Sequence, residues 1–365
     1  MVVYSFVETA EMRVRRCEPY LFVYTTRCKA RWIGREALEV FVTEFGMNPP
    51  EYYEAALTDG RITINKRLVG CSHVFRNGDV VDHRAHRHEP PVDAGPIAIV
   101  ANDAHVLALD KPASMPMHPC GAYHHNSLTG ILAEDFSENG FRAARAELKM
   151  VHRLDRLTSG LVLFAKSQEV ARDLCERIRD GGARKTYLAR VLGNFPHNAP
   201  KHLQDTCADP TAKPCVTRMR LLRRLEDGTS IVECTPLTGR THQIRLHLLW
   251  MGHAIANDGC YGGDRITNFP KGIAPATTES SHAAEDAPRL PGEGDDALVR
   301  RKCTRCRAQL DAAGDGADHS RCIWLHALRY AAVDGSWSYE TELPKWATAP
   351  AAAAPQAKPS SCALC

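Results

Sequence analysis

The stretch His152-Arg153-Leu154-Asp155-Arg156-Leu157-Thr158-Ser159-Gly160 places one carboxylate between two arginines and ends in a turn-forming Ser-Gly pair. The apolar run Leu161-Val162-Leu163-Phe164-Ala165 follows it directly. A short apolar run of this kind predicts a buried strand, so we expect Asp155 in the loop that leads into it. Nearby positive charge favours the ionised carboxylate, which suits a nucleophile or a base. Asp155 is therefore a candidate catalytic residue, with a loop-organising ion pair as the alternative.

Two further segments follow in the chain: Lys185-Thr186-Tyr187-Leu188-Ala189-Arg190-Val191, and Pro236-Leu237-Thr238-Gly239-Arg240-Thr241-His242-Gln243-Ile244-Arg245-Leu246-His247. In this order, the three segments resemble the signature motifs of the RluA-type RNA pseudouridine synthases, which isomerise uridine to pseudouridine in RNA. The resemblance continues through Gly252-His253-Ala254-Ile255 and from Asp258 to Gly262. It implies a mixed, largely antiparallel α+β pseudouridine synthase domain that binds RNA in a cleft along the sheet.

The resemblance assigns three catalytic residues. Asp155 is the catalytic carboxylate, which either adds covalently to the nucleotide or abstracts a sugar proton. Arg245 matches the arginine that pairs with this acid, because a guanidinium fork can hold a carboxylate in one orientation; a phosphate-binding arginine is the alternative. Tyr187 matches the aromatic residue that packs against the target base, although a plain core tyrosine is also compatible with the sequence.

Four residues are expected to contact the RNA. Arg153 matches a position that fills the space left by the flipped base. Arg240 is a candidate for phosphate contact, and Arg156 and His242 complete the predicted RNA-binding set. The reaction needs neither metal nor redox cofactor, and His152, His242 and His247 have no Cys or Glu at a recognised ligand spacing. We therefore expect no cofactor and no metal at these histidines.

Composition bounds these expectations. The chain has 365 residues, of which 44% are hydrophobic, enough for two or three units with a sizeable core. Its formal net charge is only +3, so RNA binding must depend on local basic patches. Fourteen cysteines without a secretory h-region favour reduced thiols inside the cell. No apolar run approaches a membrane span. We expect a cytoplasmic monomer, with nucleus and mitochondria as alternatives.

The N-terminal third is expected to hold two parts. Residues 1–35 are assigned to an N-terminal extension, of which Met12 to Arg35 resemble that of the eukaryotic branch of the family. This branch contains tRNA-modifying and related mRNA-modifying enzymes. Residues 36–94 resemble an S4-like RNA-binding module and its linker: helical spacing covers 37–45, and strand signals cover 60–65 and 76–81. A simple packing extension is the alternative. The segment Asp82–Pro91 is predicted to link the module to the next domain.

Residues 95–347 are assigned to the catalytic domain. Strand signals cover 97–100 and 106–109, and a helix is predicted over 169–180. Residues 323–330 and 339–347 resemble the closing strands of the family. Residues 264–300 are rich in Pro, Gly, Ala and acidic groups and predict a disordered insertion. The pair Cys303-Thr304-Arg305-Cys306 could join Cys322 and His319 or His326 in a zinc knuckle.

Residues 348–365 are predicted to form a flexible tail. The tail ends in Cys362-Ala363-Leu364-Cys365, which has the form of a prenylation signal, but its terminal Cys is unusual and no polybasic stretch precedes it. We expect an inert terminus there, with lipidation as the alternative.

Taken together, the sequence predicts an RNA pseudouridine synthase that acts on tRNA, with rRNA or mRNA as the alternative substrate. A non-catalytic RNA-binding protein on the same fold is the first alternative, and a metal-dependent hydrolase is the second. A zinc deaminase is excluded because the H-x-E and P-C-x-x-C spacings are missing: Pro214-Cys215 lacks a second Cys at the required offset.

Overall fold

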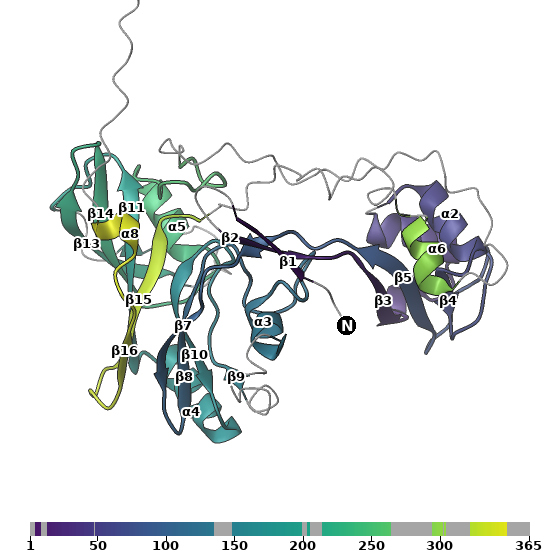
Figure 1. Ribbon diagram of the computed structural model, residues 1–365, viewed down its shortest axis with the longest axis horizontal. Helices are drawn as coiled ribbons and strands as arrows, with labels where there is room; N and C mark the ends of the chain where they lie inside the picture. Colours follow the sequence, from purple (N-terminus) through teal and green to yellow (C-terminus); the bar gives the residue numbers. More distant parts are fainter. Residues whose placement is uncertain are drawn as a thin grey trace, which may run out of the picture. The chain divides into compact units, whose positions relative to one another are not determined.

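The computed structural model describes residues 4–8, 13–46, 48–134, 148–198, 203–204, 214–263, 294–301, 303 and 322–348. The chain divides into two compact units. The smaller unit comprises residues 1–6, 15–91 and 271–319, and the larger unit comprises residues 7–14, 92–270 and 320–365. Figure 1 labels their helices and strands.

The larger unit is built on a ten-stranded sheet whose main path runs β12-β13-β14-β11-β15-β10-β8-β7. Strand β16 pairs with β15, and β9 pairs with β10. Strands β10 and β15 are parallel, whereas the other described pairs are antiparallel. The strands are β7 (Ala98–Asn102), β8 (Val106–Lys111), β9 (Lys149–Met150), β10 (Ser159–Ala165), β11 (Ala183–Leu192), β12 (Leu203–Gln204), β13 (Val216–Arg224), β14 (Thr229–Pro236), β15 (Leu325–Ala332) and β16 (Ser338–Glu340).

The core of this unit lies along β8 and β10. Residues 161–165 and 106–109 are almost completely buried, as expected for strands covered on both faces. Helix α4 (Gln168–Arg179) begins where the Ser167 hydroxyl accepts a hydrogen bond of 3.2 Å from the Val170 N–H, an N-cap that sequence patterns favour. The remaining helices of the unit are α3 (Leu128–Glu134), α5 (Gln243–Trp250) and α8 (Lys345–Thr348).

The smaller unit contains a three-stranded sheet in the order β3-β5-β4. Its strands are β3 (Tyr20–Arg27), β4 (Ile62–Ile64) and β5 (Val80–Arg87), and its helices are η1 (Ala30–Trp32), α1 (Ala37–Val40), the π-helical turn η2 (Phe41–Phe45), α2 (Pro50–Thr58) and α6 (Asp295–Arg301). Trp32, Phe41 and Tyr53 are buried together in its core. A further small sheet joins β1 (Tyr4–Glu8), β2 (Arg13–Cys17) and β6 (Val92–Asp93).

Two segments have regular secondary structure that was not predicted. Asp82–Arg87 was expected in a linker, but these residues belong to β5, which pairs along its whole length with β3. Disorder was predicted up to residue 300, but Asp295–Arg301 form α6, whose Leu298 and Val299 are buried. This helix could not be predicted from its largely polar composition. Two buried apolar residues are enough to attach it to the rest of the unit. The rest of the predicted insertion, residues 264–293, lies outside the described residues, as do residues 349–365 of the predicted tail.

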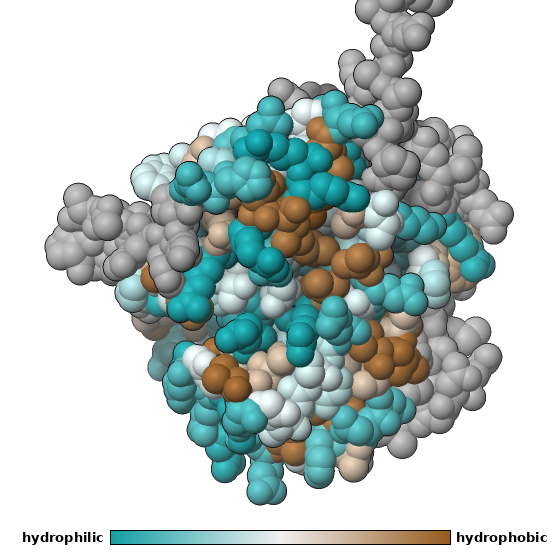
Figure 2. Space-filling model, turned by 90° about the vertical axis from the view of Figure 1, so that its left-hand side faces the viewer, coloured by the Kyte–Doolittle hydropathy of each residue, from teal (hydrophilic) through white to brown (hydrophobic). Residues whose placement is uncertain are grey.

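The fold class is confirmed: the larger unit is a mixed α+β structure with a largely antiparallel sheet. The predicted strands at 97–100, 106–109 and 161–165 and the helix at 169–180 are present within a few residues. On the face shown in Figure 2, hydrophilic and hydrophobic side chains are interspersed, as on ordinary solvent-facing protein surfaces. Among the described residues, no helix has the length and apolarity needed to cross a membrane. The S4-like identity of the smaller unit stays a prediction.

Candidate active site

The loop between β9 and β10 carries Asp155, as predicted. Three backbone carbonyls fix its course. The Thr158 N–H donates to the carbonyl of Asp155 at 3.1 Å, and the Ile323 N–H donates to the carbonyl of Leu157 at 3.2 Å. The buried ammonium of Lys111 donates to the carbonyl of Arg156 at 3.4 Å. The carboxylate is therefore presented by a loop that is held on both sides.

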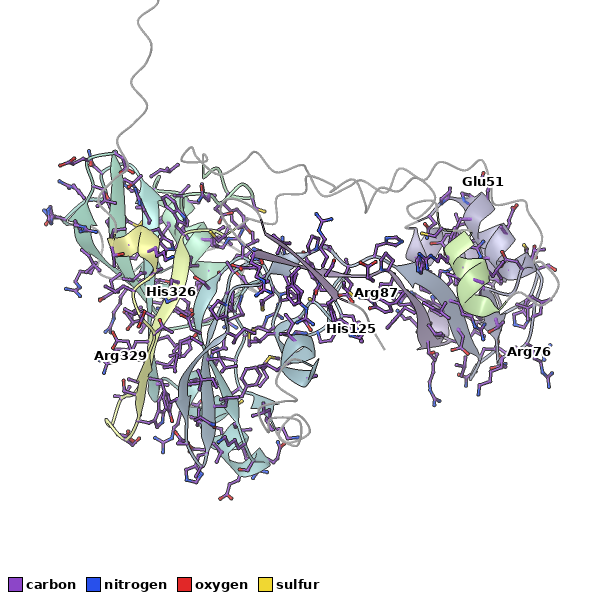
Figure 3. All side chains as sticks on the ribbon, in the orientation of Figure 1. Glu51, Arg76, Arg87, His125, His326 and Arg329 are labelled. Atoms are coloured by element: carbon purple, nitrogen blue, oxygen red, sulfur yellow. The ribbon has the colours of Figure 1, made fainter. Side chains whose placement is uncertain are left out.

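Ser159 and Gly160 attach this loop to strand β15. The Ser159 hydroxyl hydrogen-bonds His326 Nδ1 at 2.9 Å, and the Thr341 hydroxyl contacts His326 Nε2 at 2.7 Å; Figure 3 labels His326 on its strand. Gly160 has φ +112°, and a Cβ at this position would lie 2.3 Å from the carbonyl oxygen of Ala327. Only glycine allows this approach, so the Ser-Gly pair serves as scaffold for the loop.

Six of the seven predicted site residues line one cavity of about 310 Å³. Its size lies at the lower end of the range typical of small-ligand sites. In the part of the chain that the structure describes, Arg156 is not among the lining residues: its guanidinium lies 5.5 Å from the Tyr123 ring and donates to the Ser114 carbonyl at 3.4 Å. The six that line the cavity are Arg153, Asp155, Tyr187, Arg240, His242 and Arg245.

Arg245 approaches Asp155, but its closest partner is another carboxylate. Its Nη1 lies 3.7 Å from Asp155 Oδ2, an ion pair without a short hydrogen bond. Its Nε and Nη2 donate to the two oxygens of Asp258 at 2.6 and 2.8 Å, and both of these side chains are buried. Asp258 therefore orients the guanidinium that faces Asp155. The sequence predicted the first pair and missed the second.

His242 is the second nitrogen-bearing group at the carboxylate. Its Nε2 lies 3.7 Å from Asp155 Oδ2, and its Nδ1 hydrogen-bonds the Tyr261 hydroxyl at 2.8 Å. His242 precedes α5 with φ +55°, a left-handed conformation that is uncommon for a residue with a side chain. Such conformations concentrate at functional sites, where surrounding structure holds them. The sequence assigned His242 to RNA contact and did not predict its proximity to Asp155.

Tyr187 lies on β11, with only 9% of its surface exposed, and one edge of the cavity is formed by its ring. Its hydroxyl hydrogen-bonds that of Tyr330 at 2.7 Å. Burial raises the pKa of Tyr187 to about 12, so the phenol stays neutral at ordinary pH. A neutral phenol fixed by Tyr330 offers a rigid flat surface in the cavity, which suits stacking better than proton transfer.

His152 also lines the cavity, and the predicted motif did not explain its presence. Its Nε2 accepts a hydrogen bond of 3.0 Å from the Leu163 N–H, which ties the start of the motif to β10. Burial, together with the positive charge of Lys185, lowers the pKa of His152 to about 3. The imidazole is therefore neutral, and its proton must be on Nδ1.

The neutral state of the buried histidines predicts acid sensitivity. Burial and the positive charge of Lys111 lower the pKa of His326 to about 4, below its ordinary 6.5. Between these pH values the unfolded chain binds a proton that the folded chain does not, so stability falls as pH falls. The loss is about 1.4 kcal/mol per pH unit for one such group. Urea denaturation across this range measures it.

Two variants identify the source of this acid sensitivity. The slope of stability against pH should be shallower in His326→Gln, whatever that variant's stability at neutral pH. In His105→Gln, which changes an exposed histidine of the same unit, the slope should equal that of the wild type. Equal slopes in all three proteins would contradict the assignment.

A family model for RNA pseudouridylate synthase matches residues 105–250, a range that contains all three motifs. The chain is 34% identical over 365 residues to the mitochondrial tRNA pseudouridine(32) synthase of Saccharomyces cerevisiae, covering 92% of this chain and 77% of the yeast protein. It is 29% identical to the tRNA pseudouridine(31) synthase of the same yeast, covering 92% and 95%. It is 42% identical to pseudouridylate synthase RPUSD2 of Mus musculus, covering 70% of this chain but only 47% of that protein, so it spans about half the length of this relative.

Proposed function

Because the chain belongs to the RNA pseudouridylate synthase family, we propose that it isomerises uridine to pseudouridine in RNA with Asp155 as the catalytic residue. One observation carries this proposal: a single cavity combines the Asp155 carboxylate, the Arg245 guanidinium and the flat ring of Tyr187. A protein that only binds RNA has no need for an acid that lines a pocket and pairs with both an arginine and a histidine.

We propose a role for each group during the reaction. Asp155 is one quarter exposed toward the cavity, so it can reach the ribose of a bound nucleotide either as a nucleophile or as a base. Arg245 favours the ionised carboxylate and restricts its orientation. The glycosidic bond from carbon 1′ to nitrogen 1 breaks, the base turns, and carbon 5 bonds to carbon 1′. Carbon 5 loses its proton and nitrogen 1 gains one, so the product is an isomer of the substrate. Tyr187 supports the base while it is detached.

The cationic side chains around the cavity fit the removal of a base from its stack. Arg153 is exposed at the start of the loop and can occupy the space that the extruded uridine leaves. Arg240 is exposed on the opposite lining segment, where a phosphate can reach it. For Arg156, whose guanidinium lies outside the cavity, an RNA contact stays a prediction. His242 lies beside Asp155, so any contact that it makes with the nucleotide is made next to the catalytic carboxylate.

Two substitutions test the role of Tyr187. Tyr187→Ala should lower kcat/KM by roughly 5- to 150-fold, because one stacking contact contributes about 1–3 kcal/mol. Tyr187→Phe keeps the ring and should retain most activity, while the unpaired Tyr330 hydroxyl lowers stability by about 1–3 kcal/mol. Rates of tritium release from RNA labelled at carbon 5 of uridine measure the activity of both variants. Equal losses in the two variants would assign the role to the hydroxyl instead.

We propose tRNA as the substrate, since two of the yeast relatives are named for tRNA positions 32 and 31. The predicted division of the N-terminal region into an extension over 1–35 and an S4-like module over 36–94 supports additional RNA contact outside the cavity. We propose that the protein acts as a monomer. The cytoplasm is our proposed compartment, with mitochondria as the alternative that the name of one yeast relative suggests.

Pseudouridine mapping tests the proposal. Total RNA from cells that express the wild-type protein is compared with RNA from cells that express Asp155→Ala at the same level. We expect sites that are present with the wild type and absent with the variant, concentrated in tRNA. Sites confined to rRNA or mRNA would change the substrate but not the reaction. The absence of any Asp155-dependent site would favour the RNA-binding alternative.

A further inference from the structure

A cluster of three potential metal ligands lies in the smaller unit, outside the candidate active site. It consists of His86, His88 and Cys303, and we refer to it as the His–His–Cys cluster. The ligand atoms of all three residues lie within 4.8 Å of one another. His88 Nε2 is 3.0 Å from the sulfur of Cys303, and the rings of His86 and His88 are 5.1 Å apart. Two imidazoles and a thiol therefore converge from segments that are 215 residues apart in the chain.

The sheet of the smaller unit positions the two histidines. His86 lies on β5 opposite Leu21 of β3, and His88 directly follows the last residue of β5. Residues two apart along a strand point to the same side, so both imidazoles can face one point. Arg87 lies between them, and its guanidinium packs 4.6 Å from the Phe22 ring. This keeps its positive charge on the other side of the strand.

Helix α6 brings the thiol to the histidines. Leu298 and Val299 are buried, and the helix packs against β5 and β3; Figure 1 shows it beside the elements of the smaller unit. Cys303 follows two residues after the helix end, and its N–H donates to the carbonyl of Arg300 at 3.1 Å. The attachment of α6 therefore places the Cys303 thiol at the end of β5.

We propose that the His–His–Cys cluster binds one zinc ion. Zinc prefers imidazole nitrogen and thiolate sulfur, with bonds of about 2.0–2.3 Å that allow ligand atoms to be up to about 4 Å apart. The ligand atoms of the cluster lie within 4.8 Å of one another, which is close to this separation. The mixture of nitrogen and sulfur disfavours calcium and magnesium, which take oxygen ligands. All three residues are partly exposed, so an ion has access, and water can fill a fourth position.

The ion ties the segment that follows α6 to strand β5. Its binding free energy adds to the stability of the smaller unit, as in other structural zinc sites. The segment Asp82–Pro91 was predicted to link two domains, and nothing in the sequence indicates that its histidines lie next to Cys303. Catalysis at Asp155 does not use the zinc ion, so this inference and the proposed activity can fail separately.

Zinc content of the full-length protein, purified without an affinity tag, is the first test. Inductively coupled plasma mass spectrometry should find about one zinc ion per chain in the wild type. The variants Cys303→Ser and His88→Gln should lose most of it. Cys71→Ser and His73→Gln change the same residue types elsewhere in the smaller unit and should retain it. Wild-type protein without zinc after dialysis against zinc and buffer, or Cys303→Ser with a full complement, would overturn the proposal.

Cobalt substitution gives a readout in the wild-type protein, which does not depend on whether a variant folds. Wild-type protein that has been stripped of zinc and loaded with Co²⁺ should show a sulfur-to-cobalt charge-transfer band in the near ultraviolet, together with visible bands of a tetrahedral ion. The band should be absent from Cys303→Ser and present in Cys71→Ser. A cobalt spectrum without sulfur character in the wild type would contradict Cys303 as a ligand.

Discussion

Asp155→Asn should lower the single-turnover rate of uridine isomerisation by at least roughly 10²–10⁴-fold, the range for loss of a positioned acid or base. The amide has almost the same shape but can neither attack the ribose nor accept a proton as a carboxylate does. Among the described residues, the ion pairs of Asp155 with Arg245 and His242 are both long, at 3.7 Å, so the substitution should leave the fold intact. Tritium release from carbon 5 measures the rate, and urea denaturation measures the stability.

Asp180→Asn is the matched control, because Asp180 is an exposed carboxylate of the same unit that pairs with Arg179 at 2.8 Å. It should keep the wild-type rate. A second control is binding of a tRNA that carries the target uridine, which Asp155→Asn should retain within a fewfold. Activity of Asp155→Asn close to that of the wild type would remove Asp155 from the chemistry.

Asp258→Ala should destabilise the protein by about 3–5 kcal/mol, the range observed when one partner of a buried ion pair is removed. The Asp258 carboxylate accepts two short hydrogen bonds from Arg245, and both side chains are less than 5% exposed. Loss of the carboxylate leaves a buried guanidinium without its main partner. Urea denaturation measures this loss of stability. Without the Asp258 carboxylate, Arg245 is free to form a closer ion pair with Asp155.

Two comparisons make this prediction specific. Glu233→Ala removes the partner of Arg220 in a largely exposed pair and should cost at most about 1 kcal/mol. The double variant Arg245→Met with Asp258→Leu replaces the buried pair by apolar groups and should regain most of the stability. It should remain catalytically impaired, because no guanidinium faces Asp155. Full activity in the stable double variant would show that Arg245 serves the fold alone.

Local pattern predicted the elements closest to the catalytic acid. The apolar run after Gly160 is β10, and the helix predicted over 169–180 is α4. Strand β5 could not be delimited in this way, because His83 and the other polar residues after Val81 resemble a linker. The pairing of β5 with β3 overrides that composition, and pairing between distant segments has no local signature.

The candidate site was predicted from the family motifs and not from the spacing of its residues along the chain. Six of the seven expected residues share one cavity, although they come from segments up to 92 residues apart. The role of Asp258 was missed, although it belongs to a segment that continues the family resemblance. An acid near a motif arginine is a signal that could have identified it. The roles of His152 and Tyr330 required knowledge of hydrogen bonds and burial that a sequence does not contain.

The parallel pairing of β10 with β15 determines when the active site can form during synthesis. The catalytic loop depends on Ile323, His326 and Ala327, which are about 170 residues further along the chain than the loop itself. Contacts at such separation form late in folding, after the cost of closing a long loop has been met. A ribosome that has released only residues 1–320 therefore holds a chain that contains Asp155 but lacks the strand that fixes it. The enzyme acquires its activity only when its last strands have emerged.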